Sequence, residues 1–158
     1  MNDGIVIVGA GAHARKLWLY ARLMGLRVRA FVDENPAAVS PSAEIPCLHP
    51  DQVADLSAGQ SFIVAIGNPV ARRKFQEKFQ SRGWVPLVLV HPSAYVAEDA
   101  RVGAGSVICA QAVVETGSVV GAGCIVDIGV SVDHDCSVGE YCHLTTGSVL
   151  PPYARVLH

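Results

Sequence analysis

From residue 90 onward, every sixth position of this sequence carries an aliphatic side chain. These positions are Val90, Val96, Val102, Ile108, Val114, Val120, Val126, Val132, Val138, Leu144, Leu150 and Val156. An α-helix cannot produce this pattern, because its side chains return to one face after about 3.6 residues, and a half-buried strand alternates with a period of about two. The six-residue period therefore predicts short parallel strands joined by tight corners, which is a parallel β-helix.

Other residue types follow the same period. From Val96 onward, small side chains stand two residues before each aliphatic residue, with Val130 as the exception: Ala94, Ala100, Ser106, Ala112, Ser118, Cys124, Val130, Cys136, Cys142, Ser148 and Ala154. We expect them to point into the coil, with the three cysteines as core fillers. Glycine directly follows the aliphatic residue at Gly103, Gly121 and Gly139. We expect these glycines to form corners that require a positive φ.

The last coil lacks an evident cap. A solenoid needs a capping element over its terminal repeat, because an open end exposes apolar residues and strand edges. Here Pro151-Pro152 interrupts the pattern, and the sequence stops at Leu157-His158. We therefore expect a shortened form of a longer ancestral β-helix.

Residues 1–89 have a different rhythm. Apolar runs predict strands at Ile5–Val8, Val28–Val32, Phe62–Ile66 and Val85–Val90. Helical patterns lie between them, up to about residue 24, around 52–56 and over about 70–82. Strands that alternate with helices predict a parallel sheet covered on both faces. We therefore expect a Rossmann-like nucleotide-binding domain over residues 1–89 and a β-helix domain over residues 90–158.

Candidate ligand-binding residues follow strands of the predicted sheet, whose ligands bind at the carboxyl ends of the strands. They are the Gly9–Gly11 turn, Asp33 and Gly67-Asn68. A glycine turn that opens a helix offers free N–H groups to a phosphate, and Asp33 is placed to accept from a ribose hydroxyl or a base. Alternatively, the glycines only make a tight turn. A sheet of this size suits a mononucleotide or nucleotide-sugar better than the dinucleotide of a nicotinamide oxidoreductase.

His134 is the candidate catalytic residue. It stands in the run Asp133-His134-Asp135, two residues after the inward Val132, and therefore near a corner of the coil. A neutral imidazole flanked by carboxylates is suited to act as a general base, because a carboxylate fixes the tautomer and stabilises the imidazolium. Acyl transfer from a thioester needs such a base and a backbone N–H for the oxyanion. The alternative is a solvated surface histidine.

Other histidines carry weaker signals. His13 follows the glycine turn and would face a ligand bound there, unless it only caps the helix. His143 precedes the inward Leu144 and lies beyond His134 along the coil. No spacing matches a closed zinc site, and Cys136 and Cys142 are inward in the repeat. We therefore expect no metal.

Composition limits the possible partners. The formal net charge is −2 and 16% of the residues are charged, which gives no electrostatic reason to expect nucleic acid or an acidic membrane. The N-terminal apolar run has no basic flank and is too short to span a bilayer. Five cysteines, an odd number, argue against a secreted disulfide framework. We expect a cytoplasmic protein.

The order of motifs resembles a known family. The segments are GIVIVGAGAHARKL, FIVAIGNPVARRKFQEKF, HPSAYVAEDARVGAGSVICAQAVV and SVDHDCSVGEYCHLTTGSVL. Together they resemble the NeuD/PglD-type sugar acyltransferases of the hexapeptide-repeat superfamily, through nearly the whole chain. The resemblance implies a left-handed parallel β-helix and a homotrimer. It also implies acetyl-CoA-dependent acetylation of an amino group or hydroxyl on a UDP-linked sugar, for surface-glycan biosynthesis.

The resemblance also implies roles for individual residues. His134 would be the catalytic base and Asp135 its partner, with His143 near the acyl donor. The nucleotide-sugar site would contain Gly9, Gly11, His13, Asp33, Gly67 and Asn68. The sequence departs from the family pattern at Ala12 and Ala14, which stand where glycines flank the histidine, and at Asp127, where an amide is expected.

An alternative function remains open at this point. A shortened chain without a complete CoA site would be a non-catalytic nucleotide-sugar-binding or scaffold protein. The missing coils favour this alternative, whereas the intact Asp133-His134-Asp135 run favours the enzyme.

Overall fold

The computed structural model describes residues 4–53 and 59–157. The chain divides into two compact units, Met1–Leu87 and Val88–His158, and each is a structure in its own right. No helix in the described part of the chain is long and apolar enough to cross a membrane.

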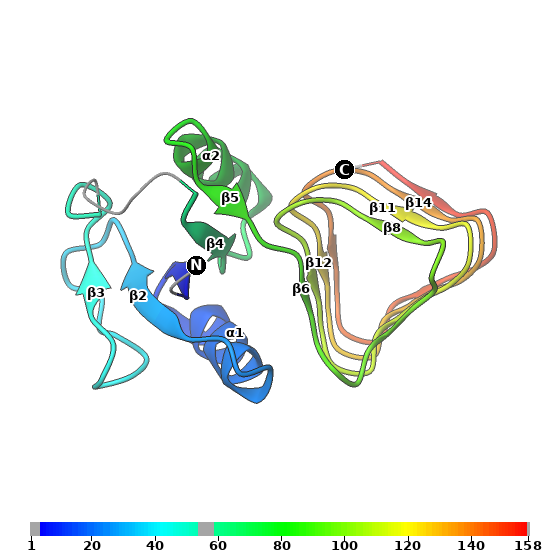
Figure 1. Ribbon diagram of the computed structural model, residues 1–158. Coiled ribbons are helices and arrows are strands. Elements are labelled where there is room, and N and C mark those ends of the chain that lie inside the picture. The colour runs from blue at the N-terminus through cyan, green and yellow to red at the C-terminus, as the bar shows by residue number, and fades with distance from the viewer. Residues whose placement is uncertain (1–3, 54–58, 158) are drawn as a thin grey trace. The chain divides into compact units, whose positions relative to one another are not determined.

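The first unit is an α/β domain (Figure 1). Its elements are β1 (Ile5–Val8), α1 (Ala12–Leu23), β2 (Val28–Val32), β3 (Cys47–Leu48), β4 (Ser61–Val64), α2 (Pro69–Gln80) and β5 (Val85–Pro86). The strands form one five-stranded parallel sheet in the order β3-β2-β1-β4-β5. Strand order reverses beside β1, and the carboxyl ends of β1, β2 and β4 surround the point where such sheets bind ligands.

The core of this unit contains a cluster of aromatic side chains. Phe62 from β4, Phe79 from α2 and Trp84 are all buried, and the rings of Phe79 and Trp84 stack with centroids 4.8 Å apart. Burial of one such side chain stabilises the fold by about 1.5–3 kcal/mol. The cluster holds α2 against the sheet and thereby fixes the loop between β4 and α2.

The structure of this unit differs from the sequence prediction in one strand and does not describe one predicted helix. The strand expected over residues 85–90 is wrong, because β5 ends at Pro86 and β6 (Leu89–Val90) belongs to the second unit. Proline has no N–H for the ladder, and Leu87 makes the last backbone bond to β4, at 2.7 Å from Phe62. The helix expected around 52–56 lies largely outside the described residues, and only the turn at 51–53 is seen.

The second unit is a triangular parallel β-helix (Figure 1). Its two-residue strands are β6 (Leu89–Val90), β7 (Tyr95–Val96), β8 (Arg101–Val102), β9 (Val107–Ile108), β10 (Val113–Val114), β11 (Val119–Val120), β12 (Ile125–Val126), β13 (Ser131–Val132), β14 (Ser137–Val138), β15 (His143–Leu144), β16 (Val149–Leu150) and β17 (Arg155–Val156). They form three four-stranded sheets, β16-β13-β10-β7, β17-β14-β11-β8 and β15-β12-β9-β6. Every third strand stacks on its predecessor, as the repeat predicts.

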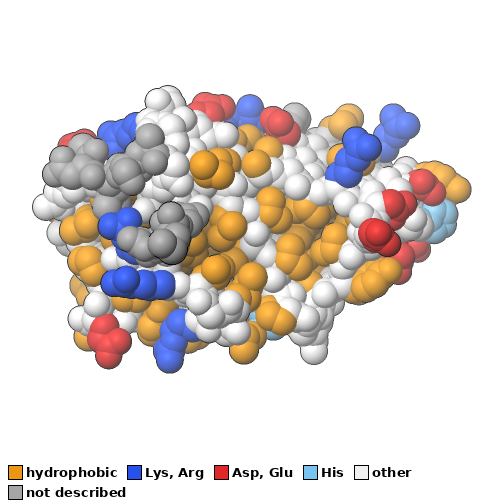
Figure 2. All heavy atoms as spheres, in the orientation of Figure 1, with side chains coloured by type: hydrophobic (Ala, Val, Ile, Leu, Met, Phe, Trp, Pro, Cys, Tyr) orange, Lys and Arg blue, Asp and Glu red, His pale blue; other side chains and the backbone are white. Residues whose placement is uncertain are grey.

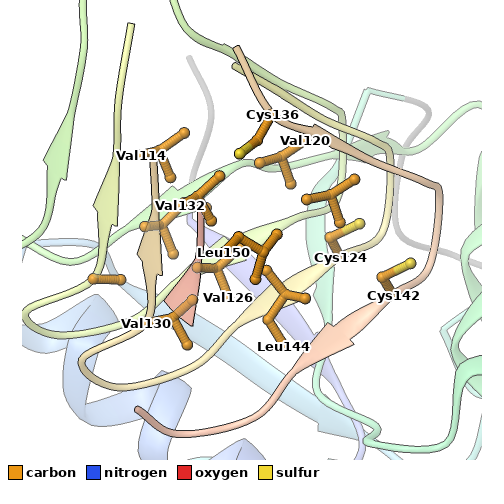
Figure 3. Packing of buried hydrophobic residues seen from close by; sticks show 13 residues of the cluster. Val114, Val120, Cys124, Val126, Val130, Val132, Cys136, Cys142, Leu144 and Leu150 are labelled. Carbon is orange, nitrogen blue, oxygen red and sulfur yellow. The ribbon is translucent and has the colours of Figure 1, made fainter. Parts of the chain in front are cut away.

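The aliphatic residues of the repeat fill the interior of the coil. Val114, Val126 and Val132 are completely buried, and Figure 3 shows them close to Leu144 and Leu150, so that side chains from two of the three sheets meet. The small positions also face inward, since Cys124, Cys136 and Cys142 belong to the same cluster. The prediction that these cysteines are core fillers is confirmed.

The prediction for the glycines that follow the aliphatic residues is wrong. The positive φ angles fall two residues later, at Gly105, Gln111, Gly117, Gly123, Gly129, Asp135, Tyr141, Gly147 and Tyr153. Gly121 is needed for a different reason: a Cβ there would lie 2.7 Å from Glu140 N and 2.8 Å from Gly139 C, in the next coil. Gly103 likewise faces the backbone of Gly121 and Ala122. These glycines allow close approach between successive coils.

Candidate functional site

His134 and Asp135 form the two-residue turn between β13 and β14. The imidazole Nδ1 lies 2.9 Å from Asp135 Oδ2, and the side chains are 39% and 51% exposed. A carboxylate at this distance favours a proton on Nδ1, which leaves Nε2 with the lone pair of a base. The pair is therefore accessible and has the geometry of a general base with its orienting carboxylate.

Charges around the turn act on the His134 ring. The hydrogen bond to Asp135 raises the pKa of His134 above its ordinary value, partial burial opposes this, and the negative charges of Asp133, Asp135 and Glu115 add to the rise. Figure 2 shows acidic side chains gathered beside a histidine on the β-helix unit. A raised pKa makes His134 a stronger base, but it is neutral only at a correspondingly higher pH.

Asp135 is held by the coil that precedes it. Its φ is 58°, a conformation that costs a non-glycine residue energy, and its N–H donates to Thr116 O at 3.0 Å. Gly117 leaves the space for its carboxylate, because a Cβ at Gly117 would lie 2.5 Å from Asp135 Oδ1. The loop below is braced in turn, since Thr116 Oγ1 donates to Asp99 at 2.7 Å. Stacked corners thus fix the carboxylate that orients His134.

Tyr153 lies one coil beyond Asp135. Its ring meets the His134 ring edge to face, with centroids 5.1 Å apart and planes at 85°, and its N–H donates to His134 O at 3.1 Å. Sequence reasoning missed this residue. The repeat gave a usable signal, because residues 18 apart stack, as Ser106 and Cys124 do.

His143 makes a separate pair. Its Nε2 lies 3.3 Å from Asp127 Oδ2, and the side chains are 33% and 16% exposed. Asp127, noted as a departure in the sequence, therefore acts as the partner of His143.

Both carboxylate oxygens of Asp33 accept hydrogen bonds from backbone N–H groups of neighbouring loops. Oδ2 accepts from Ala10 N in the glycine turn at 3.0 Å, and Oδ1 accepts from Asn35 N at 2.9 Å. A cavity of about 290 Å³ lies here, lined by residues that include Gly9, Asp33 and Ile66. Asp33 thus ties the turn after β1 to the loop after β2, and a carboxylate has further lone pairs for a ligand.

The two glycines of the turn differ in what surrounds them. Gly9 has a φ of 109°, and a Cβ there would lie 2.9 Å from Ala65 O. The fold therefore requires glycine at this position. Gly11 has an ordinary φ of −81°, and nothing lies within 4 Å of a Cβ built on it. The space above Gly11 is open to a ligand.

The start of α1 has the features of an anion site. Gly11 is its N-cap without a side-chain cap bond, and the first turn contains no acidic residue. Exposed Arg15 lines a hollow of about 260 Å³ together with Gly11 and Ala12. The N–H groups at a helix start, beside a guanidinium, suit a phosphate. His13 lies half-buried in the same turn. Sequence reasoning missed Arg15, although it is in the first helical turn.

Asn68 and Gly67 form the start of α2. Asn68 Oδ1 accepts from Ala71 N at 3.0 Å and caps the helix, so this oxygen has a structural role. Arg72 is fully buried, and its Nη1 donates to Ile66 O at 2.9 Å and Gly67 O at 2.7 Å. Arg72 holds the carbonyls of the loop, and nothing in the sequence pattern indicated this role.

A larger hollow lies elsewhere in the first unit. Its volume is about 850 Å³, and it lies beside α1 and residues 41–46. It contains none of the predicted site residues. Within the described residues, no group of three or more His, Cys, Asp or Glu residues is placed to hold a metal ion.

The chain is similar to a known protein family and to several solved structures. The family model described as the PglD N-terminal domain matches residues 4–79. The structure of PerB from Caulobacter crescentus, in complex with CoA and GDP-perosamine, is 32% identical, with a TM-score of 0.83; the match covers 92% of this chain and 70% of that one. No curated protein matches the sequence.

Two further solved structures are similar. The acetyltransferase domain of PglB from Neisseria gonorrhoeae FA1090, in complex with acetyl coenzyme A, is 32% identical, with a TM-score of 0.85 and coverage of 96% of this chain and 74% of that chain. WeeI from Acinetobacter baumannii AYE is 20% identical with a TM-score of 0.83, over 96% of this chain and 71% of that chain. The WeeI match shows shared fold alone.

The fold and these relatives define an acyltransferase that acts on sugars. The chain belongs to the NeuD/PglD-type sugar acyltransferases of the hexapeptide-repeat superfamily. The predicted Rossmann-like sheet followed by a left-handed β-helix is confirmed.

Proposed function

We propose that this protein transfers the acetyl group of acetyl-CoA to an amino group on a nucleotide-linked sugar, as a step in surface-glycan biosynthesis. The observation that carries the proposal is the exposed pair of His134 and Asp135, 2.9 Å apart, at a corner of the β-helix. Relatives at 32% identity support both substrates, because their structures contain CoA with GDP-perosamine and acetyl coenzyme A.

His134 is the base in the proposed reaction. The amine nitrogen attacks the thioester carbonyl carbon, and Nε2 of His134 takes the proton that the amine loses. Asp135 keeps the other ring nitrogen protonated and stabilises the imidazolium. When the tetrahedral intermediate collapses, the carbon–sulfur bond breaks and the proton passes to the CoA thiolate. The products are an N-acetyl sugar and free CoA, so the base is regenerated.

The first unit, predicted over residues 1–89, supplies the proposed nucleotide-sugar site. The diphosphate binds the N–H groups at the start of α1 and Arg15, and the nucleoside enters the cavity beside Asp33 and Ile66. We predict a UDP-linked sugar. The relative with bound GDP-perosamine makes GDP the alternative to test. Gly67 and Asn68 border the sugar.

The predicted β-helix domain, residues 90–158, supplies the chemistry and the donor site. We propose a homotrimer, with acetyl-CoA bound near His143 in a groove between copies. Acetyl-CoA and nucleotide sugars are both cytoplasmic metabolites, and we propose that the protein acts there.

A turnover assay tests this function. The wild-type protein is incubated with acetyl-CoA and, in parallel, UDP-linked and GDP-linked 4-amino sugars, and the acetylated product is measured by mass spectrometry. We expect turnover with the UDP sugar. No turnover with either sugar would contradict the acetyltransferase proposal, and turnover with the GDP sugar alone would correct the nucleotide.

Substitution of the proposed base sharpens the test. His134→Ala is expected to lower kcat by at least about 1,000-fold, because the amine then loses its proton acceptor. Nucleotide-sugar affinity, measured by calorimetry, should stay within about twofold of wild type, since the nucleotide-sugar site is assigned to the first unit. Unchanged turnover would contradict the role of His134.

A further inference from the structure

The turns that surround His134 leave few hydrogen-bond donors for a reacting carbonyl. An attack on a thioester places negative charge on the carbonyl oxygen, and enzymes stabilise that charge with N–H or O–H groups. Three turns stack at this corner: residues 115–118, 133–136 and 151–154. Each backbone N–H in them can be followed to its partner.

The turn that contains His134 has no N–H to spare. Asp133 N donates to Leu150 O at 3.1 Å, and Asp135 N donates to Thr116 O at 3.0 Å. His134 N donates to Asp133 Oδ1 at 2.7 Å. The last amide, Cys136 N, donates to Ser118 Oγ at 3.0 Å.

Every backbone N–H of the preceding turn, residues 115–118, also donates a hydrogen bond within the β-helix. Glu115 N donates to Val132 O at 2.9 Å, and Ser118 N donates to Glu115 O at 3.2 Å. Thr116 N donates to Glu115 Oε2 at 3.3 Å, and Gly117 N donates to Asp99 Oδ2 at 3.1 Å.

The following turn begins with two residues that have no N–H at all. Pro151 and Pro152 lack the donor, Tyr153 N is bound to His134 O at 3.1 Å, and Ala154 N is bound to Pro151 O at 3.1 Å. The stacked backbone therefore offers no free N–H to an oxyanion at this corner.

The described hydrogen bonds use all but one of the side-chain hydroxyl groups of these turns. Thr116 Oγ1 donates to Asp99 at 2.7 Å, and Ser118 Oγ donates to Asp133 O at 2.7 Å. Within residues 4–53 and 59–157, the Tyr153 hydroxyl makes no hydrogen bond, and the residue is 68% exposed. Its ring packs edge to face on the His134 ring, 5.1 Å between centroids, so the tyrosine side chain lies against the proposed base.

We propose that the Tyr153 hydroxyl donates the hydrogen bond that stabilises the oxyanion during acetyl transfer, in place of a backbone N–H. This inference rests on the proposed acetyltransferase function. As the amine attacks, the carbonyl π pair moves to oxygen and is held by the Tyr153 O–H, while His134 Nε2 takes the amine proton. The pair returns to carbon as the thiolate leaves, so the tyrosine keeps its proton throughout.

The conservative substitution Tyr153→Phe tests the hydroxyl alone. Phenylalanine retains the ring contact with His134, so the fold and the acid limb of the pH–rate profile should be unchanged. Loss of one oxyanion donor is expected to lower kcat on the order of 100-fold, with KM for both substrates within about twofold of wild type. The matched control is Tyr95→Phe, which removes the hydroxyl of another exposed tyrosine, 54% accessible, on a β-helix strand and should leave kcat unchanged.

The possible outcomes test the role of Tyr153 separately from the proposed acetyltransferase function. Loss of kcat in Tyr153→Phe but not in Tyr95→Phe would support the hydroxyl role. Full kcat in Tyr153→Phe, with an active wild type, would overturn the inference and leave the acetyltransferase intact. An altered pH profile with unchanged limiting kcat would also overturn it, because Tyr153 would then only position His134. An inactive wild type would contradict both proposals.

Discussion

The two candidate sites of this molecule are built from different parts of the chain. In the first unit, the candidate site at the carboxyl ends of the strands, here called the crevice, is bordered mainly by backbone groups. Asp33 accepts from Ala10 N and Asn35 N. Arg72 donates to the carbonyls of Ile66 and Gly67. At the β-helix corner, by contrast, the backbone N–H groups are consumed by coil stacking, and side chains project from it. We infer that the crevice is suited to recognition and the corner to chemistry.

Carboxylates illustrate the same difference. Both oxygens of Asp33 accept from backbone N–H groups of its own unit, so this aspartate shapes a loop. Asp135 instead directs one oxygen at a histidine ring 2.9 Å away. A change at Asp33 should therefore disturb binding and folding together, whereas a change at Asp135 should act on the reaction.

After the loss of the base itself in His134→Ala, the largest expected effect comes from Asp135→Asn. The amide cannot stabilise the imidazolium, so kcat should fall by about 100-fold. Because Asp135 raises the pKa of His134, its removal lowers that pKa, and the acid limb of kcat/KM should move to lower pH. The measurement is a pH–rate profile of both proteins. A limb that stays in place would show that Asp135 does not control the protonation of His134.

A smaller effect is expected on stability when a coil-spacing glycine is changed. Gly121→Ala forces a Cβ to within 2.7 Å of Glu140 N, and such overpacking costs about 1–3 kcal/mol. Chemical denaturation gives the free energy of unfolding. The control is Gly129→Ala, where φ is 65° and nothing lies within 4 Å of the new Cβ, so only the backbone term of about 1 kcal/mol applies. A loss in Gly129→Ala as large as that in Gly121→Ala would contradict the close-approach explanation.

The smallest effect is expected at the glycine that faces open space. Gly11→Ala places a methyl group in the hollow beside Arg15 and should weaken nucleotide-sugar binding by about tenfold, which corresponds to about 1.4 kcal/mol. Stability should fall by no more than about 1 kcal/mol, because φ at Gly11 is ordinary and only the preference of an N-cap for glycine over alanine is lost. Calorimetric titration and a denaturation curve measure the two quantities. Unchanged affinity would place the diphosphate elsewhere.

The sequence predicts the β-helix well because its period admits one kind of structure. The repeat also places His134 near a corner, since the inward Val132 precedes it by two residues. It does not give the φ angles, and so the roles of Gly103 and Gly121 were misassigned. The period alone does not say which corner residue adopts the left-handed conformation and which one faces the neighbouring coil.

Other parts of the sites depend on contacts that no local pattern contains. The bond of Asp33 to Ala10 N spans 23 residues, and burial of Arg72 follows from the packing of α2 on the sheet. The predicted binding roles of Gly9 and Asn68 also acquire structural explanations, because Gly9 requires its φ of 109° and Asn68 caps α2. Tyr153 was within reach of the sequence, because stacking of residues 18 apart places it beside Asp135.

The most direct test of this division of labour compares His134→Ala with Gly11→Ala in one set of measurements. For each variant, kcat at saturating substrates and the dissociation constant of the nucleotide sugar are determined beside the wild type. We predict that His134→Ala loses kcat at unchanged affinity, and that Gly11→Ala loses affinity at unchanged kcat. Substantial turnover by His134→Ala, or loss of nucleotide-sugar binding in that variant, would contradict the assignment of the chemistry to the β-helix corner.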